Sequence, residues 1–255
     1  MYLNIRWMNA PMILSWGDLD NYLHDIWRAL PAKTGVFIMA RDGFQIALQQ
    51  IEEDLLKMAA FVEDVIAKSI QAMTRSDNRL ADTIISNDSV VDDLREHIHE
   101  HVALTIEKWA PLGKALRRIL AYLVIADELE RMGDYGVHVA RSAHAGFPSM
   151  PLTLIGKMSE LAQQVRVQLR SGVAAFAQND TDAARAVCLN DTVIDLAYKA
   201  LYRELLKYMC DYSDAVQETT QFLFTMHDLE RIGDRVANIC ESIIYIETGK
   251  YEKLN

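Results

Sequence analysis

A repeated six-residue motif constrains this chain more than any other feature of its sequence. The segment LERMGD at residues 129–134 returns as LERIGD at residues 229–234, 100 positions later. A second match, between NDSVVD at residues 87–92 and NDTVID at residues 190–195, has an offset of 103 positions. Two matches at nearly the same offset indicate a duplication, so we expect the chain to fold as two copies of one unit.

The apolar residues of the first half recur at helical spacing. From Phe44 to Val65 they lie three or four positions apart with charged residues between them, which predicts one buried stripe on a long first helix. That helix should end near residues 74–77, where Ser and Asp are favourable helix caps. One periodic segment then runs from residue 80 to Trp109, and Pro111 suits the first turn of a third helix.

The second half repeats this plan. Residues 144–151 read HAGFPSMP, and their Gly and two Pro predict a boundary between the halves. Further helices are expected over about residues 152–177, 181–209 and 213–248. The fold class predicted is all-α, with two tandem antiparallel three-helix bundles related by a pseudo-twofold.

The predicted domain bounds follow from these elements. The first three-helix repeat spans residues 39–147 and the second spans residues 151–251. Residues 1–38 hold three of the four tryptophans and are interpreted as an N-terminal extension or a misassigned start. No function is assigned to this segment.

Charge and cysteine content exclude several classes of function. The formal net charge of −10 argues against nucleic acid as a partner, because such a chain repels phosphate backbones. Three widely spaced cysteines without a C-x-x-C pattern predict neither a disulfide framework nor a thiolate zinc site, which favours a reducing, cytoplasmic location. No apolar run reaches the roughly 18–20 residues of a membrane span, so no direct span is expected.

Paired carboxylates accompany both repeated motifs. In each pair the two acids lie four residues apart and therefore share one helix face. The pairs are Asp88 with Asp92 and Glu130 with Asp134 in the first half, and Asp191 with Asp195 and Glu230 with Asp234 in the second. If the second and third helices of each repeat pack antiparallel, four carboxylates could meet, and such oxygen ligands suit Fe, Mn, Mg or Ca.

Two simpler interpretations remain open. The acids could form a solvated face with charge pairs to Arg131 and Arg231. Gly133 and Gly233, each costing about 1 kcal/mol in a helix relative to Ala, could be present only to admit close helix packing.

The histidines and the catalytic motifs give no enzyme assignment. His97 and His101 share a helix face, but Glu-x-x-His does not recur on a second helix as a ferritin-like di-iron centre requires, so an exposed or hydrogen-bonded histidine cluster is the preferred interpretation. No H-E-x-x-H, G-x-S-x-G, P-loop or G-x-G-x-x-G motif is present. We therefore expect no catalytic activity.

The repeated motifs, together with DNRLA at residues 77–81 and IETGK at residues 246–250, resemble those of the PhoU family of phosphate-signalling regulators. The resemblance covers about residues 41–251. It implies metal ligation by the eight carboxylates named above. The implied metals are iron or other divalent or trivalent ions such as Mn, Mg or Zn.

The resemblance also implies a function and partners. The function would be negative regulation of phosphate uptake and of the phosphate-starvation response. The protein would act as a cytoplasmic homodimeric adapter between the ATPase subunit of a phosphate ABC transporter and a sensor histidine kinase. The alternative is a metal-storage bundle or a carboxylate-bridged metalloenzyme, which would use the same acids.

Overall fold

The computed structural model describes residues 34–254, and this part contains helices and no β-strand, which confirms the all-α prediction. Most of the predicted extension, residues 1–38, lies outside the described residues. Within the described part, residues 44–254 belong to one compact unit. The elements are α2 (Thr34–Arg75), α3 (Asn78–Ser86), α4 (Ser89–Trp109), α5 (Lys114–Ala145), α6 (Leu152–Gln178), α7 (Thr181–Asp211), the 3-10 turn η1 (Ser213–Ala215) and α8 (Val216–Thr248).

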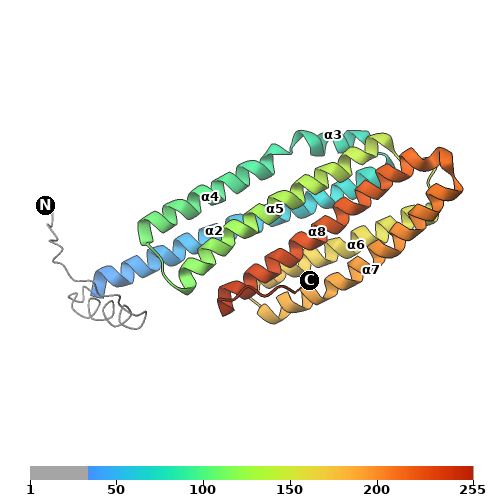
Figure 1. The fold of residues 1–255 in the computed structure, drawn as a ribbon. Coiled ribbons are helices and arrows are strands. Elements are labelled where there is room, and N and C mark those ends of the chain that lie inside the picture. The colour runs from blue at the N-terminus through green and yellow to red at the C-terminus, as the bar shows by residue number, and fades with distance from the viewer. Residues whose placement is uncertain (1–33, 255) are drawn as a thin grey trace, which may run out of the picture. The chain divides into compact units, whose positions relative to one another are not determined.

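The helices fall into two three-helix repeats, with α3 and α4 together forming the second helix of the first repeat. The third helices, α5 and α8, pack side by side along much of their length (Figure 1). On one side of this pair α3 and α4 contact α5, and on the other side α6 and α7 contact α8. The tandem helical-bundle fold is therefore confirmed.

The two repeats share one hydrophobic core. Tyr122 of α5 meets Phe176 of α6 edge to face, with ring centroids 5.9 Å apart. Phe147, in the connection between the repeats, packs in the same manner against Phe222 of α8 at 5.0 Å. The two repeats, predicted over residues 39–147 and 151–251, therefore pack against each other, with α5 of the first against α8 of the second. Their bounds as separate domains stay a prediction.

The second helix of the first repeat is broken, whereas the sequence pattern predicted one segment. Helix α3 ends at Ser86 and α4 begins at Ser89. The Thr83 carbonyl accepts two side-chain hydrogen bonds, one from the Ser86 hydroxyl at 3.0 Å and one from the Asn87 side-chain amide at 2.9 Å. Such side-chain bonds compete with the helical backbone pattern. In α7 Cys188 and Leu189 precede the matching Asn–Asp pair, and that helix is continuous.

The start of α3 agrees with the sequence-based prediction, whereas the start of α5 differs from it. Asp77 caps α3 as expected, because its carboxylate accepts a hydrogen bond from the Leu80 backbone N–H at 3.1 Å. Pro111 does not begin the third helix. It lies in the connection after Ala110, and α5 begins at Lys114, following Gly113 with a positive φ of 58°. The left-handed turn at Ala110 and Gly113 therefore sets the start of α5.

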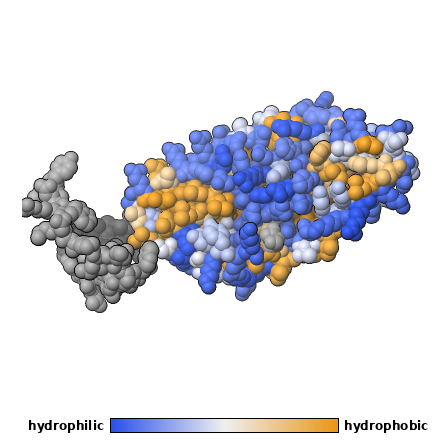
Figure 2. Space-filling model, in the orientation of Figure 1, coloured by the Kyte–Doolittle hydropathy of each residue, from blue (hydrophilic) through white to orange (hydrophobic). Residues whose placement is uncertain are grey.

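Hydrophilic residues cover most of the face drawn in Figure 2, with separate apolar areas between them. Several large aliphatic side chains on α7 are exposed. Within residues 34–254, none of the helices combines the length and apolar character that crossing a membrane requires.

Candidate functional site

The eight predicted ligands lie in two groups, one in each repeat. We call Asp88, Asp92, Glu130 and Asp134 the first carboxylate cluster, and Asp191, Asp195, Glu230 and Asp234 the second carboxylate cluster. The first lies where α4 and its preceding break face α5, and the second lies where α7 faces α8. In each cluster the acids of the two helices lie near enough to influence one another electrostatically.

Basic side chains reach the first carboxylate cluster. Arg95 approaches Glu130 at 3.7 Å, and Arg141 lies 4.0 Å from Asp88. Asp88 occupies the break between α3 and α4 without capping α4 through its side chain. These side chains are partly exposed, so each ion pair contributes little to stability on its own.

The second carboxylate cluster is more buried. Asp191 is only 6% exposed and accepts a hydrogen bond from the Gln168 amide of α6 at 2.8 Å. Lys199 lies 2.7 Å from Asp195, and Arg231 lies 3.0 Å from Asp234. These pairs fit the interpretation of an acidic face balanced by basic neighbours, including the predicted contact of Arg231.

Glu230 is the least satisfied acid of the second carboxylate cluster. Its Oε2 atom is buried and has no hydrogen-bond partner among the described residues. His227, one turn earlier on α8, is the nearest base, with Nδ1 3.4 Å from that oxygen. A buried carboxylate oxygen without a donor is costly unless the group is protonated or binds a cation.

Burial and like charges raise the pKa of acids in both clusters. Burial raises the pKa of Glu230 to about 7, and the charges of Asp234, Asp195 and Asp191 add to that rise against the opposing effect of Arg231. Burial likewise raises the pKa of Glu130, with Asp134 contributing next. The carboxylates are therefore held close enough to repel one another, which is an arrangement that a bound cation would stabilise.

The motif glycines have a packing role in both repeats. A Cβ on Gly133 would lie 3.2 Å from Val91 of α4, and a Cβ on Gly233 would lie 3.0 Å from the Gln168 Oε1 and 3.5 Å from the Asp191 Oδ1. The absence of a side chain lets the second and third helices approach closely. Both glycines therefore admit close packing of the helices that carry the acids.

The donor set suits a hard cation, but the coordination is not preformed. Carboxylate oxygens are the ligands that Mg²⁺, Mn²⁺ and ferric iron favour. In the described part of the chain, no three acids of either cluster each place an oxygen within 4.8 Å of the other two. Binding at Asp191, Asp195, Glu230 and Asp234 would therefore require their side chains to rotate toward the unpartnered oxygen of Glu230.

Replacing Glu230 by Gln should stabilise the metal-free protein above neutral pH. The native carboxyl holds its proton more tightly in the folded state, with a pKa near 7, than in the unfolded state, with a pKa near 4.5. Its contribution to the free energy of unfolding therefore falls as pH rises from about 4.5 to about 7. Solvent screening reduces the effect, so we expect a gain of about 1 kcal/mol for Glu230→Gln at pH 8.

Urea unfolding of chelator-treated protein at pH 5 and pH 8 measures this gain. The two proteins should differ little at pH 5, where the native Glu230 is mostly protonated in the folded state. Glu107→Gln, at an exposed position near the end of α4, is the control and should change stability by less than about 0.5 kcal/mol. A gain that is equal at both pH values would contradict the expectation.

One group of candidate ligands was not predicted from the sequence. Asp54 of α2 lies between His97 and His101 of α4, and one ligand atom from each lies within 4.8 Å of the other two. The sequence placed the two histidines on one face but gave no means of choosing the acid, because Asp54 precedes His97 by 43 positions on another helix.

Comparisons with known proteins give the same family over both repeats. The family model described as the PhoU domain matches residues 55–143 and 158–243. The "Phosphate-specific transport system accessory protein PhoU homolog" of Clostridium acetobutylicum is 32% identical over 218 residues, which cover 85% of this chain and all of the relative. The Escherichia coli K12 protein named "Phosphate-specific transport system accessory protein PhoU" is 30% identical over 207 residues, covering 81% of this chain and 86% of the relative.

Solved structures agree with the sequence comparisons. The crystal structure of the phosphate transport system regulatory protein PhoU from Streptococcus pneumoniae matches with a TM-score of 0.77 and 25% identity, over 82% of this chain and 99% of that chain. PhoU from Pseudomonas aeruginosa matches with a TM-score of 0.76 and 28% identity, over 81% of this chain and all of that chain.

Proposed function

This chain belongs to the PhoU family, and from that premise we propose that it is a negative regulator of phosphate uptake and of the phosphate-starvation response. It would act in the cytoplasm as an adapter between the ATPase subunit of a phosphate ABC transporter and a sensor histidine kinase. When phosphate is plentiful it would hold the kinase in its phosphatase-favouring state.

The family match over both repeats is the observation that carries this proposal. The relatives that span most of this chain are named accessory proteins of a phosphate-specific transport system, and one structural relative is named a regulatory protein. An accessory or regulatory role fits a protein whose sequence has none of the common catalytic motifs. We propose on this ground that the protein is not an enzyme.

An exposed apolar stripe on α7 supports regulation by contact. Leu189, Val193 and Leu196 follow the i, i+4, i+7 spacing of one helix face, and their exposed fractions are 69%, 48% and 62%. Large aliphatic side chains gathered on a surface are typical of protein–protein contact sites. We propose that this α7 stripe contacts a cytoplasmic part of the transporter or the kinase.

The two carboxylate clusters would hold metal ions in the proposed adapter. The unpartnered oxygen of Glu230 and the mutual repulsion of the acids support this assignment. A bound iron, manganese, magnesium or zinc ion would supply positive charge that links the second helix of a repeat to the third. Asp191 and Asp195 would bind from α7, and Glu230 and Asp234 from α8.

Substituting the α7 stripe should weaken partner binding without unfolding the protein. A charge at Leu196 would have to be buried in the contact, so Leu196→Asp should reduce recovery of transporter or kinase by about tenfold or more, which corresponds to about 1.4 kcal/mol. Affinity purification of the tagged protein from phosphate-replete and phosphate-starved cells, with quantitative mass spectrometry, measures the recovery.

Two controls show whether a loss of recovery is specific to the α7 stripe. Leu152→Asp changes another exposed leucine, at the start of α6, and should leave recovery unchanged. Recovery should also differ between the two phosphate conditions, because an adapter can shift its partner only by binding one signalling state more tightly. If neither the transporter nor the kinase is recovered in either condition, the adapter proposal fails and the metal-storage alternative takes its place.

A further inference from the structure

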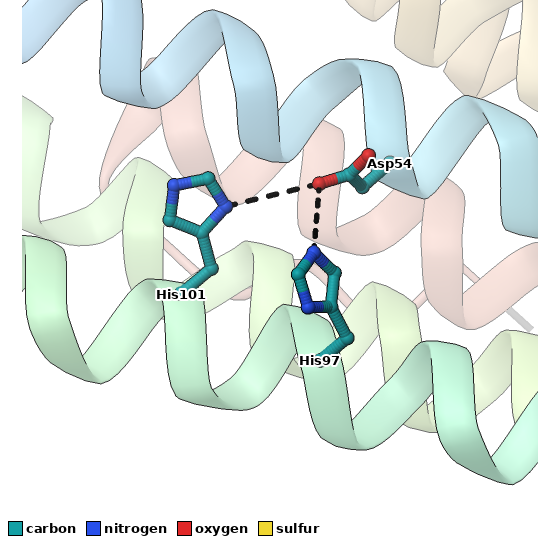
Figure 3. Close-up of side chains that lie close together, drawn as sticks. All are labelled: Asp54, His97 and His101. Carbon is teal, nitrogen blue, oxygen red and sulfur yellow. Dashed lines mark ion pairs between the residues drawn. The ribbon is translucent and has the colours of Figure 1, made fainter.

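A side-chain cluster between α2 and α4 has the composition of a transition-metal site. Asp54 projects from α2 toward α4, where His97 and His101 lie one turn apart and face it (Figure 3). Asp54 Oδ2 is 3.5 Å from His97 Nε2 and 3.7 Å from His101 Nδ1. A single carboxylate oxygen therefore faces one nitrogen of each imidazole.

These separations match the spacing of ligands around one ion better than the spacing of hydrogen bonds. An N–H···O bond has a donor–acceptor distance of about 2.7–3.2 Å. Two ligand atoms each about 2.1 Å from a tetrahedral ion lie about 3.4 Å from each other. The Nδ1 atom of His101 is buried and makes no hydrogen bond within the described residues, so it is available as a ligand.

Neighbouring side chains orient the carboxylate. Lys57, one turn after Asp54 on α2, lies with Nζ 2.9 Å from Asp54 Oδ1. That contact fixes one oxygen and leaves Oδ2 directed at the two histidines. Outer contacts of this kind position the ligands in many metal sites. The Asp54 side chain is 17% exposed and that of His97 is 61% exposed, so an ion here would be reached from solvent and keep room for water.

We propose that Asp54, His97 and His101 bind one divalent transition-metal ion, and that Zn²⁺ fits this ligand set. Two imidazoles and one carboxylate, with a fourth position left for water, are the ligands of many zinc sites. Two histidines four residues apart on a helix present both rings on one face, as metal-binding helices do. The all-carboxylate clusters, by contrast, suit harder cations.

The proposed zinc site is separate from both carboxylate clusters and occurs in one repeat. It lies between α2 and α4, whereas the first carboxylate cluster lies between α4 and α5. Lys157 and Glu204 lie 103 positions after Asp54 and His101, which is the offset of the repeat. They form an ion pair at 2.5 Å, so in the second repeat opposite charges link the corresponding helices, α6 and α7, without histidine.

Titration of Zn²⁺ into chelator-treated full-length protein tests the proposal. Isothermal titration calorimetry should show one Zn²⁺ site that persists when Glu130→Gln and Glu230→Gln disable the carboxylate clusters. His97→Ala, His101→Ala and Asp54→Asn should each weaken that binding by about 100-fold or more, because loss of an outer contact alone costs about 10–100-fold. Circular dichroism confirms that each variant is folded.

Two control variants make the result specific. His99→Ala removes a histidine of α4 that pairs instead with Asp127 at 3.1 Å, and it should keep the native Zn²⁺ affinity. Glu130→Gln combined with Glu230→Gln should also keep it, because those acids belong to the carboxylate clusters. Unchanged affinity in the three ligand variants, or an equal loss in His99→Ala, would overturn the proposed zinc site.

Discussion

Replacing Gly172 by valine should destabilise the protein by about 3 kcal/mol, the upper part of the range for overpacked cores. A Cβ at this buried position of α6 would lie 2.7 Å from Val236 Cγ1 of α8 and 3.6 Å from Cys240 Sγ. Contacts that short force the two helices apart or drive side chains out of their rotamers. Because α6 and α8 belong to the shared core, the loss should appear as a lower free energy of unfolding.

Gly156→Ala is the matched control for this substitution. It lies on the same helix, and a Cβ there would meet nothing within 4 Å. Alanine should therefore stabilise the protein by up to about 1 kcal/mol through helix propensity. Urea unfolding compares the two variants with the native protein. Equal stability of Gly172→Val and the native chain would show that α6 and α8 do not approach as closely as described.

Replacing both Glu130 and Glu230 by Gln should remove metal from the carboxylate clusters. Each substitution keeps the size of the side chain and removes an anionic ligand from the centre of one cluster. The affinity for Mn²⁺ or Fe²⁺ should fall by about 100-fold or more, exceeding the loss expected for an outer contact. Elemental analysis of protein purified without chelator, followed by titration with Mn²⁺, measures both the content and the affinity.

The same double variant should be at least as stable as the native chain when both are free of metal. Burial and repulsion raise the pKa of Glu130 and Glu230, so removing their charge relieves a cost at neutral pH. Asp54→Asn, outside both clusters, should leave Mn²⁺ binding by the carboxylate clusters unchanged. If the double variant retains the native manganese and iron content, the carboxylate assignment is wrong.

The repeat and the apolar periodicity predicted an all-helical chain and placed each pair of acids on one helix face. Residues four apart on a helix share a face whatever the tertiary structure, so Asp191 with Asp195 and Glu230 with Asp234 could be paired in advance. That the two pairs would face each other followed from the expected antiparallel packing. The metal at these clusters stays a prediction.

Long-range contacts could not be predicted in the same way. Gln168 of α6 donates to Asp191, and Asp54 of α2 meets two histidines of α4, yet neither residue belongs to a repeated motif. The break near Asn87 was also missed. The apolar period continues through it, while the Thr83 carbonyl accepts from side chains and the Asn87 N–H bonds to the Ile84 carbonyl instead. Such features depend on which helices pack together and on local competition for hydrogen bonds.

Expression of a phosphate-starvation reporter in a strain lacking this protein tests the proposed regulation most directly. In phosphate-rich medium the reporter should be fully on in the deletion strain, with excess phosphate uptake. The native gene should restore repression, and Leu196→Asp should fail to restore it although the variant is folded and present at native levels. Normal repression in the deletion strain, with no second family member to compensate, would contradict the proposed function.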